Sequence, residues 1–162
     1  MMIRRAPARA SCLVAALGVA IVLSAAPRGA AAQRGELQPR RLTFKDRFAG
    51  VSADGISSVW EGSIDGAARG RIRVELHQVE GPAEAASPVW HVVSHWSVDD
   101  PSGARSFEAE LEGMVDWRTG ATRLSGVITQ GWMKGAWVQE HGRFVNGDAS
   151  GTLAIAPQVA RP

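Results

Sequence analysis

Apolar and polar residues alternate along most of this chain, and the pattern is clearest in its C-terminal third. Phe107, Ala109 and Leu111 alternate with glutamates, which places apolar side chains on one face of a strand and carboxylates on the other. Further segments of the same kind follow, separated by turns rich in glycine. Asn146-Gly147 is a strong hairpin signal, because both central residues of a type I′ turn have positive φ. This region therefore predicts successive antiparallel β-hairpins.

The same alternation extends over the preceding residues and predicts eight strands in all. The turns between them are short, so strands adjacent in the sequence are expected to be neighbours in space. An eight-strand meander can close into a barrel, which removes its exposed edges. We therefore predict an all-β fold, a single antiparallel meander barrel of about eight strands over residues 42–157, with a two-sheet β-sandwich as the alternative. The expected strands are 42–51, 56–64, 69–79, 89–98, 107–112, 124–128, 138–144 and 149–155.

Successive turns of a meander are expected at alternating ends of the barrel. One end should gather the connections at 80–88, 117–120 and 146–148. The other end should gather 65–68, 99–105 and 131–135. Trp117 and Trp132 fall in these turns, so they either fold back over the two ends as plugs or present flat surfaces to sugars or partner proteins; we favour plugs.

The first 32 residues have the pattern of a secretory signal peptide and are not expected in the fold. The apolar core of this leader is shorter than the roughly 20 residues that a membrane-spanning helix requires. We expect export to the periplasm or the medium, with no membrane span after cleavage. A flexible lead-in at 33–41 and a tail at 158–162 would flank the barrel. The features of the leader are Arg4, Arg5 and Arg9, the apolar run 13–23, and Ala30-Ala31-Ala32 before Gln33.

The basic character of the chain belongs largely to this leader. Four of the 18 Lys and Arg residues lie in it, which leaves 14 bases against 16 acids in the remaining 130 residues. Nucleic-acid binding requires a clustered basic surface, so it is not expected. The only cysteine, Cys12, also lies in the leader, so the mature chain is expected to have no disulfide and no thiolate chemistry.

A set of short motifs stands out in the last third of the chain: Leu111-Glu112-Gly113, Asp116-Trp117-Arg118-Thr119-Gly120, Leu124-Ser125-Gly126-Val127-Ile128-Thr129 and Gly135-Ala136. This set resembles a pattern in uncharacterised secreted bacterial proteins, whose shape is similar to the small calycin-like and allene-oxide-cyclase-like barrels. The resemblance implies a β-barrel scaffold. The chain matches none of the catalytic or ligand-binding motifs of those families, so no functional residue is carried over.

Glu140 is the main candidate for chemistry. It lies in the otherwise apolar register of the strand formed by Ala136, Val138, Gly142 and Phe144. If that face is internal, burial would raise the pKa of the carboxyl group and make it a proton acceptor or a ligand anchor. A bulge, or a change of parity in this strand, would instead place the carboxylate in solvent.

The strand at 89–98 is the most apolar of the set and is expected to line the interior. Its even positions carry Trp90, Val92, Trp96 and Val98 together with Ser94, whereas His91, Val93 and His95 should face outward. The tryptophans either fill the core or line a cavity. The predicted ligand-binding residues are therefore Trp90, Ser94, Trp96 and Glu140.

Other polar clusters are expected on the outer face. His91 and His95 share a strand face but lie about 13 Å apart, too far for one metal ion to bridge without a neighbouring His77 or His141. We predict no metal site and no cofactor. The glutamates at 108, 110 and 112 fit a solvated stripe better than a catalytic pair.

The sequence has no Gly-x-Ser-x-Gly elbow and no phosphate-binding glycine loop. We therefore expect a secreted, non-catalytic β-barrel that binds a small apolar ligand or another surface. One alternative is an interaction or structural module of the cell envelope. The other is an isomerase or cyclase type of enzyme with Glu140 as general base. The pattern leaves ligand identity and oligomeric state open.

Overall fold

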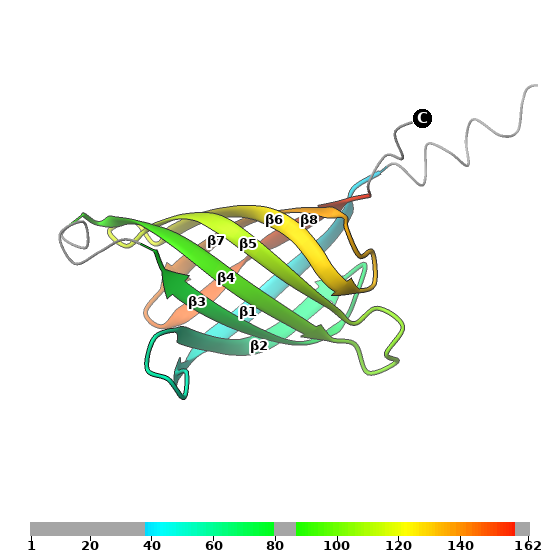
Figure 1. Ribbon diagram of the computed structural model, residues 1–162, viewed down its shortest axis with the longest axis horizontal. Helices are drawn as coiled ribbons and strands as arrows, with labels where there is room; N and C mark the ends of the chain where they lie inside the picture. The colour runs from blue at the N-terminus through cyan, green and yellow to red at the C-terminus, as the bar shows by residue number, and fades with distance from the viewer. Residues whose placement is uncertain (1–37, 80–86, 158–162) are drawn as a thin grey trace, which may run out of the picture.

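The computed structural model describes residues 38–79 and 87–157, which form one closed antiparallel barrel (Figure 1). Each strand pairs with its neighbour in sequence, and β1 pairs with β8 to close the barrel. The predicted all-β meander is confirmed, and the β-sandwich is not observed. The strands are β1 Arg40–Val51, β2 Ser58–Gly66, β3 Gly70–Gln78, β4 Val89–Asp99, β5 Phe107–Asp116, β6 Ala121–Gly131, β7 Trp137–Val145 and β8 Asp148–Ala156.

Some predictions concern residues outside the described ranges. These are the signal peptide at 1–32, the lead-in residues 33–37, the loop residues 80–86 and the tail at 158–162. Within the described ranges, no helix is long and apolar enough to cross a membrane.

The strand boundaries differ slightly from those expected. β1 begins at Arg40, because Arg40 and Arg41 pair with the end of β8 and so belong to the barrel rather than to a lead-in. β2 begins only at Ser58. The residues before it form a loop in which the Asp54 carboxylate accepts hydrogen bonds from the Ser52 hydroxyl, at 2.5 Å, and from the Ile56 backbone N–H, at 3.1 Å. This local turn replaces the first two residues of the expected strand.

The interior is filled by the alternate residues of all eight strands, as a period of two requires. On β4, Val92, Trp96 and Val98 are buried as predicted, and Trp90 is half-buried near one end of the barrel. The core comprises Leu42, Phe44, Trp60, Ile64, Ala68, Ile72, Val74, Leu76, Val92, Trp96, Val98, Phe107, Ala109, Leu111, Val115, Leu124, Ile128, Ala136, Val138, Ala149, Leu153 and Ile155.

The connections gather at the two ends as expected from the meander. At one end the Trp117 N–H donates to Pro88 O, and the Phe48 N–H donates to Gly147 O. At the other end the Trp132 N–H donates to Ser106 O, and the start of β1 and the end of β8 lie there too (Figure 1). The β7–β8 turn has φ of 53° at Asn146 and 85° at Gly147, which confirms the predicted hairpin geometry.

Candidate ligand-binding site

Two carboxyl groups lie inside the barrel, near the end that holds the β1–β2, β5–β6 and β7–β8 connections. Asp46 is 7% exposed and Glu140 is 2% exposed. Strand parity puts both there: Asp46 follows Leu42 and Phe44 at a spacing of two, and Glu140 follows Val138 in the same way. Of the two placements left open for Glu140, the structure shows the internal one, and a second buried acid accompanies it.

Glu140 accepts a hydrogen bond from Thr122, and it has room because the neighbouring Gly142 lacks a side chain. The Thr122 hydroxyl donates to Glu140 Oε1 at 2.7 Å, whereas Glu140 Oε2 is buried without a partner in the described structure. A Cβ on Gly142 would overlap Glu140 Oε1 and would lie 2.8 Å from Thr122 Oγ1. The absence of a side chain at Gly142 therefore makes room for the Thr122–Glu140 pair.

Asp46 lies beside small residues of the neighbouring strands. It pairs in register with Gly62 of β2 and Ala149 of β8. A Cβ on Gly62 would lie only 2.8 Å from Asp46 Cβ, so glycine permits the close approach of β1 and β2 at this level. The Asp46 Oδ1 atom, like Glu140 Oε2, is buried with no hydrogen-bond partner among the described residues.

Burial raises the pKa of both carboxyl groups. For Asp46, loss of hydration is the largest cause, its own backbone N–H counteracts it, and negative Asp148 adds to the rise, so the pKa is about 7. For Glu140, burial again dominates, Thr122 and the Leu124 backbone counteract it, and negative Asp46 raises it further, so the pKa is also about 7. Each acid is therefore close to half protonated at neutral pH.

The two acids line a cavity of only about 20 Å³. That volume suffices for about one water molecule, whereas small-molecule sites usually enclose roughly 300–1,000 Å³. The barrel interior is therefore packed, and no preformed chamber holds a whole ligand within the described residues. Trp60 Nε1, 6% exposed as a residue, is a third polar atom buried without a partner beside this cavity. The lining residues are Phe44, Asp46, Trp60, Val74, Leu76, Trp96, Thr122, Leu124, Glu140, Arg143, Phe144 and Ala149.

A continuous row of five aromatic side chains runs across this end of the barrel. Trp60 is its centre, with the Phe48 ring at 5.5 Å and the Phe144 ring at 4.5 Å between centroids. Trp117 stacks on Phe144 at 5.2 Å with an interplanar angle of 16°, and Trp90 meets Trp117 edge-on at 5.3 Å. We call these five residues the aromatic row and this end of the barrel the aromatic end. Trp117 thus folds back against another ring, as predicted, although it stays 37% exposed.

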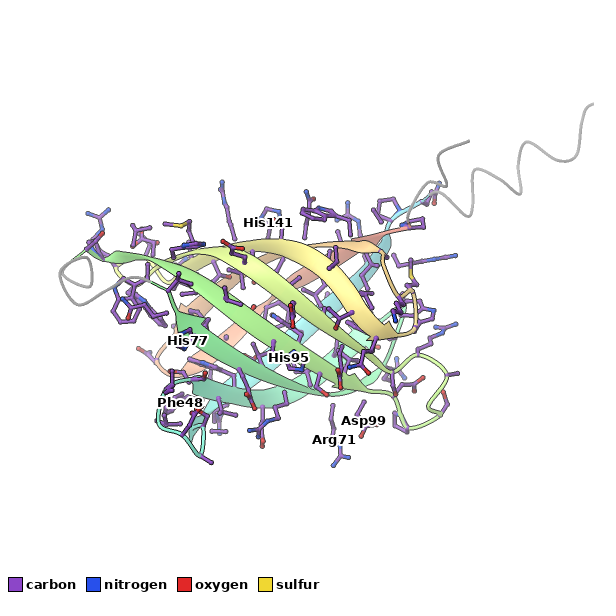
Figure 2. All side chains as sticks on the ribbon, in the orientation of Figure 1. Phe48, Arg71, His77, His95, Asp99 and His141 are labelled. Carbon is purple, nitrogen blue, oxygen red and sulfur yellow. The ribbon has the colours of Figure 1, made fainter. Side chains whose placement is uncertain are left out.

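The rim of the aromatic end is apolar as well. Phe48 is 45% exposed and is visible at this end in Figure 2. Near the opposite end, Trp137 and its register partner Val127 are exposed apolar side chains. The remaining exposed apolar side chains on the connections and strand ends of the aromatic end are Val51, Ile56, Val79, Val89 and Val145.

The predicted site residues are only partly brought together. Trp96 and Glu140 line the cavity, and Trp90 lies in the aromatic row, where its Nε1 donates to Ser87 O at 2.9 Å. Ser94 does not line the cavity. Its hydroxyl donates to Leu111 O at 3.3 Å and accepts from Trp96 Nε1 at 3.0 Å, so it fixes the Trp96 ring instead of facing a ligand.

Sequence reasoning missed Asp46, Trp60, Thr122 and Phe144. A usable signal existed for Asp46, because it occupies the apolar register of its strand just as Glu140 does. Thr122 could not be recognised without the register that sets β6 beside β7.

The outer face carries paired charges. Arg71 and Asp99 form an ion pair at 2.8 Å, and Figure 2 shows them far from Phe48, toward the opposite end of the barrel. A hollow of about 430 Å³ on this face is lined by charged groups that pair with one another, Arg71 with Asp99 and Arg73 with Glu61. Glu110 and Glu112 are exposed and Glu108 is half-buried, so the predicted outer stripe is confirmed.

The four histidines also occupy outward register positions. His77 and His141 are exposed, His91 and His95 are half-buried, and His91 Nε2 lies 2.6 Å from Glu112 Oε1. Across residues 38–79 and 87–157, no group of three or more His, Cys, Asp or Glu side chains is arranged to hold a metal ion.

Comparisons with protein families, with curated proteins and with solved structures gave no match to this chain.

Proposed function

We propose that this protein is a secreted, non-catalytic barrel that binds a small, largely apolar ligand at its aromatic end. The observation that carries the proposal is the aromatic row and its exposed apolar rim, placed directly over buried polar atoms that lack partners: Asp46 Oδ1, Trp60 Nε1 and Glu140 Oε2. Contiguous exposed apolar surface marks interaction sites, and buried unpaired polar atoms cost stability unless something pairs with them.

The size of the cavity defines the mode of binding. At about 20 Å³ it admits one small polar group, so the apolar body of the ligand must lie against or between the rings of the aromatic row. Phe48 and Trp117 are the most exposed of these rings, so they can change rotamer without opening the packed core. The ligand would therefore be partly enclosed.

Fluorescence titration of the purified protein with N-phenyl-1-naphthylamine, a neutral apolar probe, tests this proposal. We expect saturable enhancement that weakens about tenfold in Phe48→Ala and in Trp117→Ala, because each removes a large apolar contact. Trp137→Ala is the matched control, since Trp137 is 46% exposed near the opposite end. Absence of saturable binding, or an equal loss in the Trp137→Ala control, would refute the proposed site.

Export is the other part of the proposal, and it is supported by the leader pattern in residues 1–32. Amino-terminal sequencing of the protein recovered from periplasm or medium should begin at Gln33. Recovery of the uncleaved chain from the cytoplasm alone would contradict it.

An enzyme of the isomerase or cyclase type is the second candidate, favoured by one observation. Glu140 is buried beside apolar side chains and its pKa of about 7 suits a general base. In that case Glu140→Gln would abolish turnover of a substrate while leaving N-phenyl-1-naphthylamine binding intact. Full turnover by Glu140→Gln would remove this candidate.

A further inference from the structure

We infer that the ligand carries a primary ammonium group, which enters the cavity between Asp46 and Glu140 while its apolar body contacts the aromatic row. This inference depends on the proposed binding function, because it specifies the ligand of that same site. Four properties of the cavity support it: its unpaired acceptors, its volume, its local charge and its aromatic wall.

The unpaired acceptors come first. Asp46 Oδ1 and Glu140 Oε2 are both buried without a hydrogen-bond partner in the described structure. An ionised carboxylate can only accept hydrogen bonds, so these atoms require a donor. An ammonium group has three donors and can serve two acceptors at once, and hydrogen bonds between charged partners are the stronger kind.

The volume then selects among cations. A cavity of about 20 Å³ holds roughly one water molecule, and a primary ammonium group is of similar size. A quaternary ammonium group or a planar guanidinium group is larger than one water molecule, so we expect it to enter only if lining side chains such as Phe44 and Trp60 move apart. The site is therefore matched to the smallest organic cation.

The negative charge of the two acids favours a cationic ligand, because the protein itself places little positive charge beside them. Each carboxyl group feels a neighbouring acid, Asp148 in the case of Asp46 and Asp46 in the case of Glu140. Arg143 lines the cavity, but it is exposed and its Nε donates to Thr119 O at 3.1 Å. Two buried acids without a paired cation are costly, and a cationic ligand would offset that cost.

The aromatic side chains that line the cavity also favour a cation. Trp60 and Phe144 line the cavity with their rings 4.5 Å apart, and ring faces attract cations. The Trp60 Nε1–H acts differently, because as a donor it prefers an oxygen acceptor such as a hydroxyl or carboxylate. A carboxylate would be repelled by the two acids. We therefore expect ligand head groups to rank ammonium first, hydroxyl second and carboxylate last.

Three ligands with the same apolar body test this ranking: 4-phenylbutylamine, 4-phenylbutan-1-ol and 4-phenylbutyrate. Each displaces N-phenyl-1-naphthylamine from the protein at pH 8, where Asp46 and Glu140 are mostly ionised and the amine is still protonated. We expect the amine to bind about tenfold more tightly than the alcohol, as charge-assisted hydrogen bonds predict. The acid should bind most weakly.

The isosteric double variant Asp46→Asn/Glu140→Gln should bring the amine down to the affinity of the alcohol, with both affinities measured against the naphthylamine affinity of the same variant. Asp148→Asn is the control for surface charge, since its side chain is 60% exposed, and it should change amine affinity less than about twofold.

A titration of the unmodified protein gives an independent readout. The charged groups around the cavity are Asp46, Glu140 and Arg143, with Asp148 next to Asp46. The preference for amine over alcohol should disappear between pH 8 and pH 5.5 as the two buried acids take up protons.

Equal affinity for all three ligands, with the naphthylamine probe still bound, would overturn the ammonium inference and leave the binding function intact. Retention of the amine preference in the double variant would also overturn it. Failure of the probe and all three ligands to bind would instead refute the proposed function itself.

Discussion

Stability of the barrel should fall as pH rises from 5 to 8, opposite to the behaviour of a protein whose acids are stabilised by ion pairs. In the folded chain Asp46 and Glu140 have pKa values raised from 3.8 and 4.5 to about 7. In the unfolded chain both ionise near their ordinary values, so between about pH 4.5 and 7 the folded state binds more protons. Stability is therefore greatest at the acidic side of this range and is lost as pH rises through the folded pKa values.

The size of the expected loss of stability follows from the two pKa shifts. One unit of pKa corresponds to about 1.4 kcal/mol, so each carboxyl group accounts for roughly 3–4 kcal/mol. Because the charge of Asp46 contributes to the raised pKa of Glu140, the two contributions are not simply additive, and we expect a combined loss of at least about 3 kcal/mol. That is a substantial part of the roughly 5–15 kcal/mol typical of a domain. Asp65 and Asp100 have lowered pKa values, so their contribution is lost only at more acidic pH, below the range compared.

Urea unfolding followed by tryptophan fluorescence at pH 5, 6, 7 and 8 measures the effect. We expect the midpoint to fall by roughly 1–3 M urea across this range. In Asp46→Asn/Glu140→Gln the dependence of the midpoint on pH should largely vanish, because the variant removes the two acids that cause it and leaves the other charged groups unchanged. A midpoint that is flat or rises toward pH 8 in the unmodified protein would refute the reasoning, as would the same fall in the double variant.

Three substitutions test the packing of the interior and the geometry of the β7–β8 turn, each measured as the free energy of unfolding. Gly142→Ala places a methyl group against Glu140 and Thr122 and 3.0 Å from Phe44 Cζ, so we expect a loss of about 1–3 kcal/mol; no loss would show that the cavity is looser than described. Gly147→Val meets no atom within 4 Å but forces a branched residue to a φ of 85°, which should cost more than about 1 kcal/mol, whereas Gly147→Asn should cost less. Trp96→Ala removes a ring that is 3% exposed and should cost about 3–5 kcal/mol, against less than about 1 kcal/mol for Trp137→Ala; similar losses for both would contradict the assigned burial.

The two-residue periodicity of the strands is enough to predict most of the fold and some of the residues of the candidate site. Alternation predicts that Val92 and Trp96 point inward, because a strand has only two faces and one of them is clearly apolar, and it makes Glu140 internal if its strand keeps that parity. The same rule applies to Asp46, which follows Leu42 and Phe44 in the apolar register of its strand.

The aromatic row could not be derived in this way. Its contacts, such as Trp117 on Phe144, join residues of a turn and a strand that alternation does not relate. The volume of the interior could not be predicted from the sequence either, since it depends on how large rings such as Phe44 fill the space left by Gly142 on β7 and Gly151 on β8.

The most direct test of the ligand site is the spectrum of the six tryptophan indole N–H groups, recorded by ¹H–¹⁵N NMR during titration with 4-phenylbutylamine. Trp60, Trp90 and Trp117 belong to the aromatic row, whereas Trp132 and Trp137 lie toward the opposite end of the barrel. We predict progressive shifts of the first three signals, largest for Trp60, while the signals of Trp132 and Trp137 stay in place. Shifts confined to Trp132 and Trp137, or no shift of any indole at millimolar ligand, would contradict the assignment of the aromatic end as the binding site.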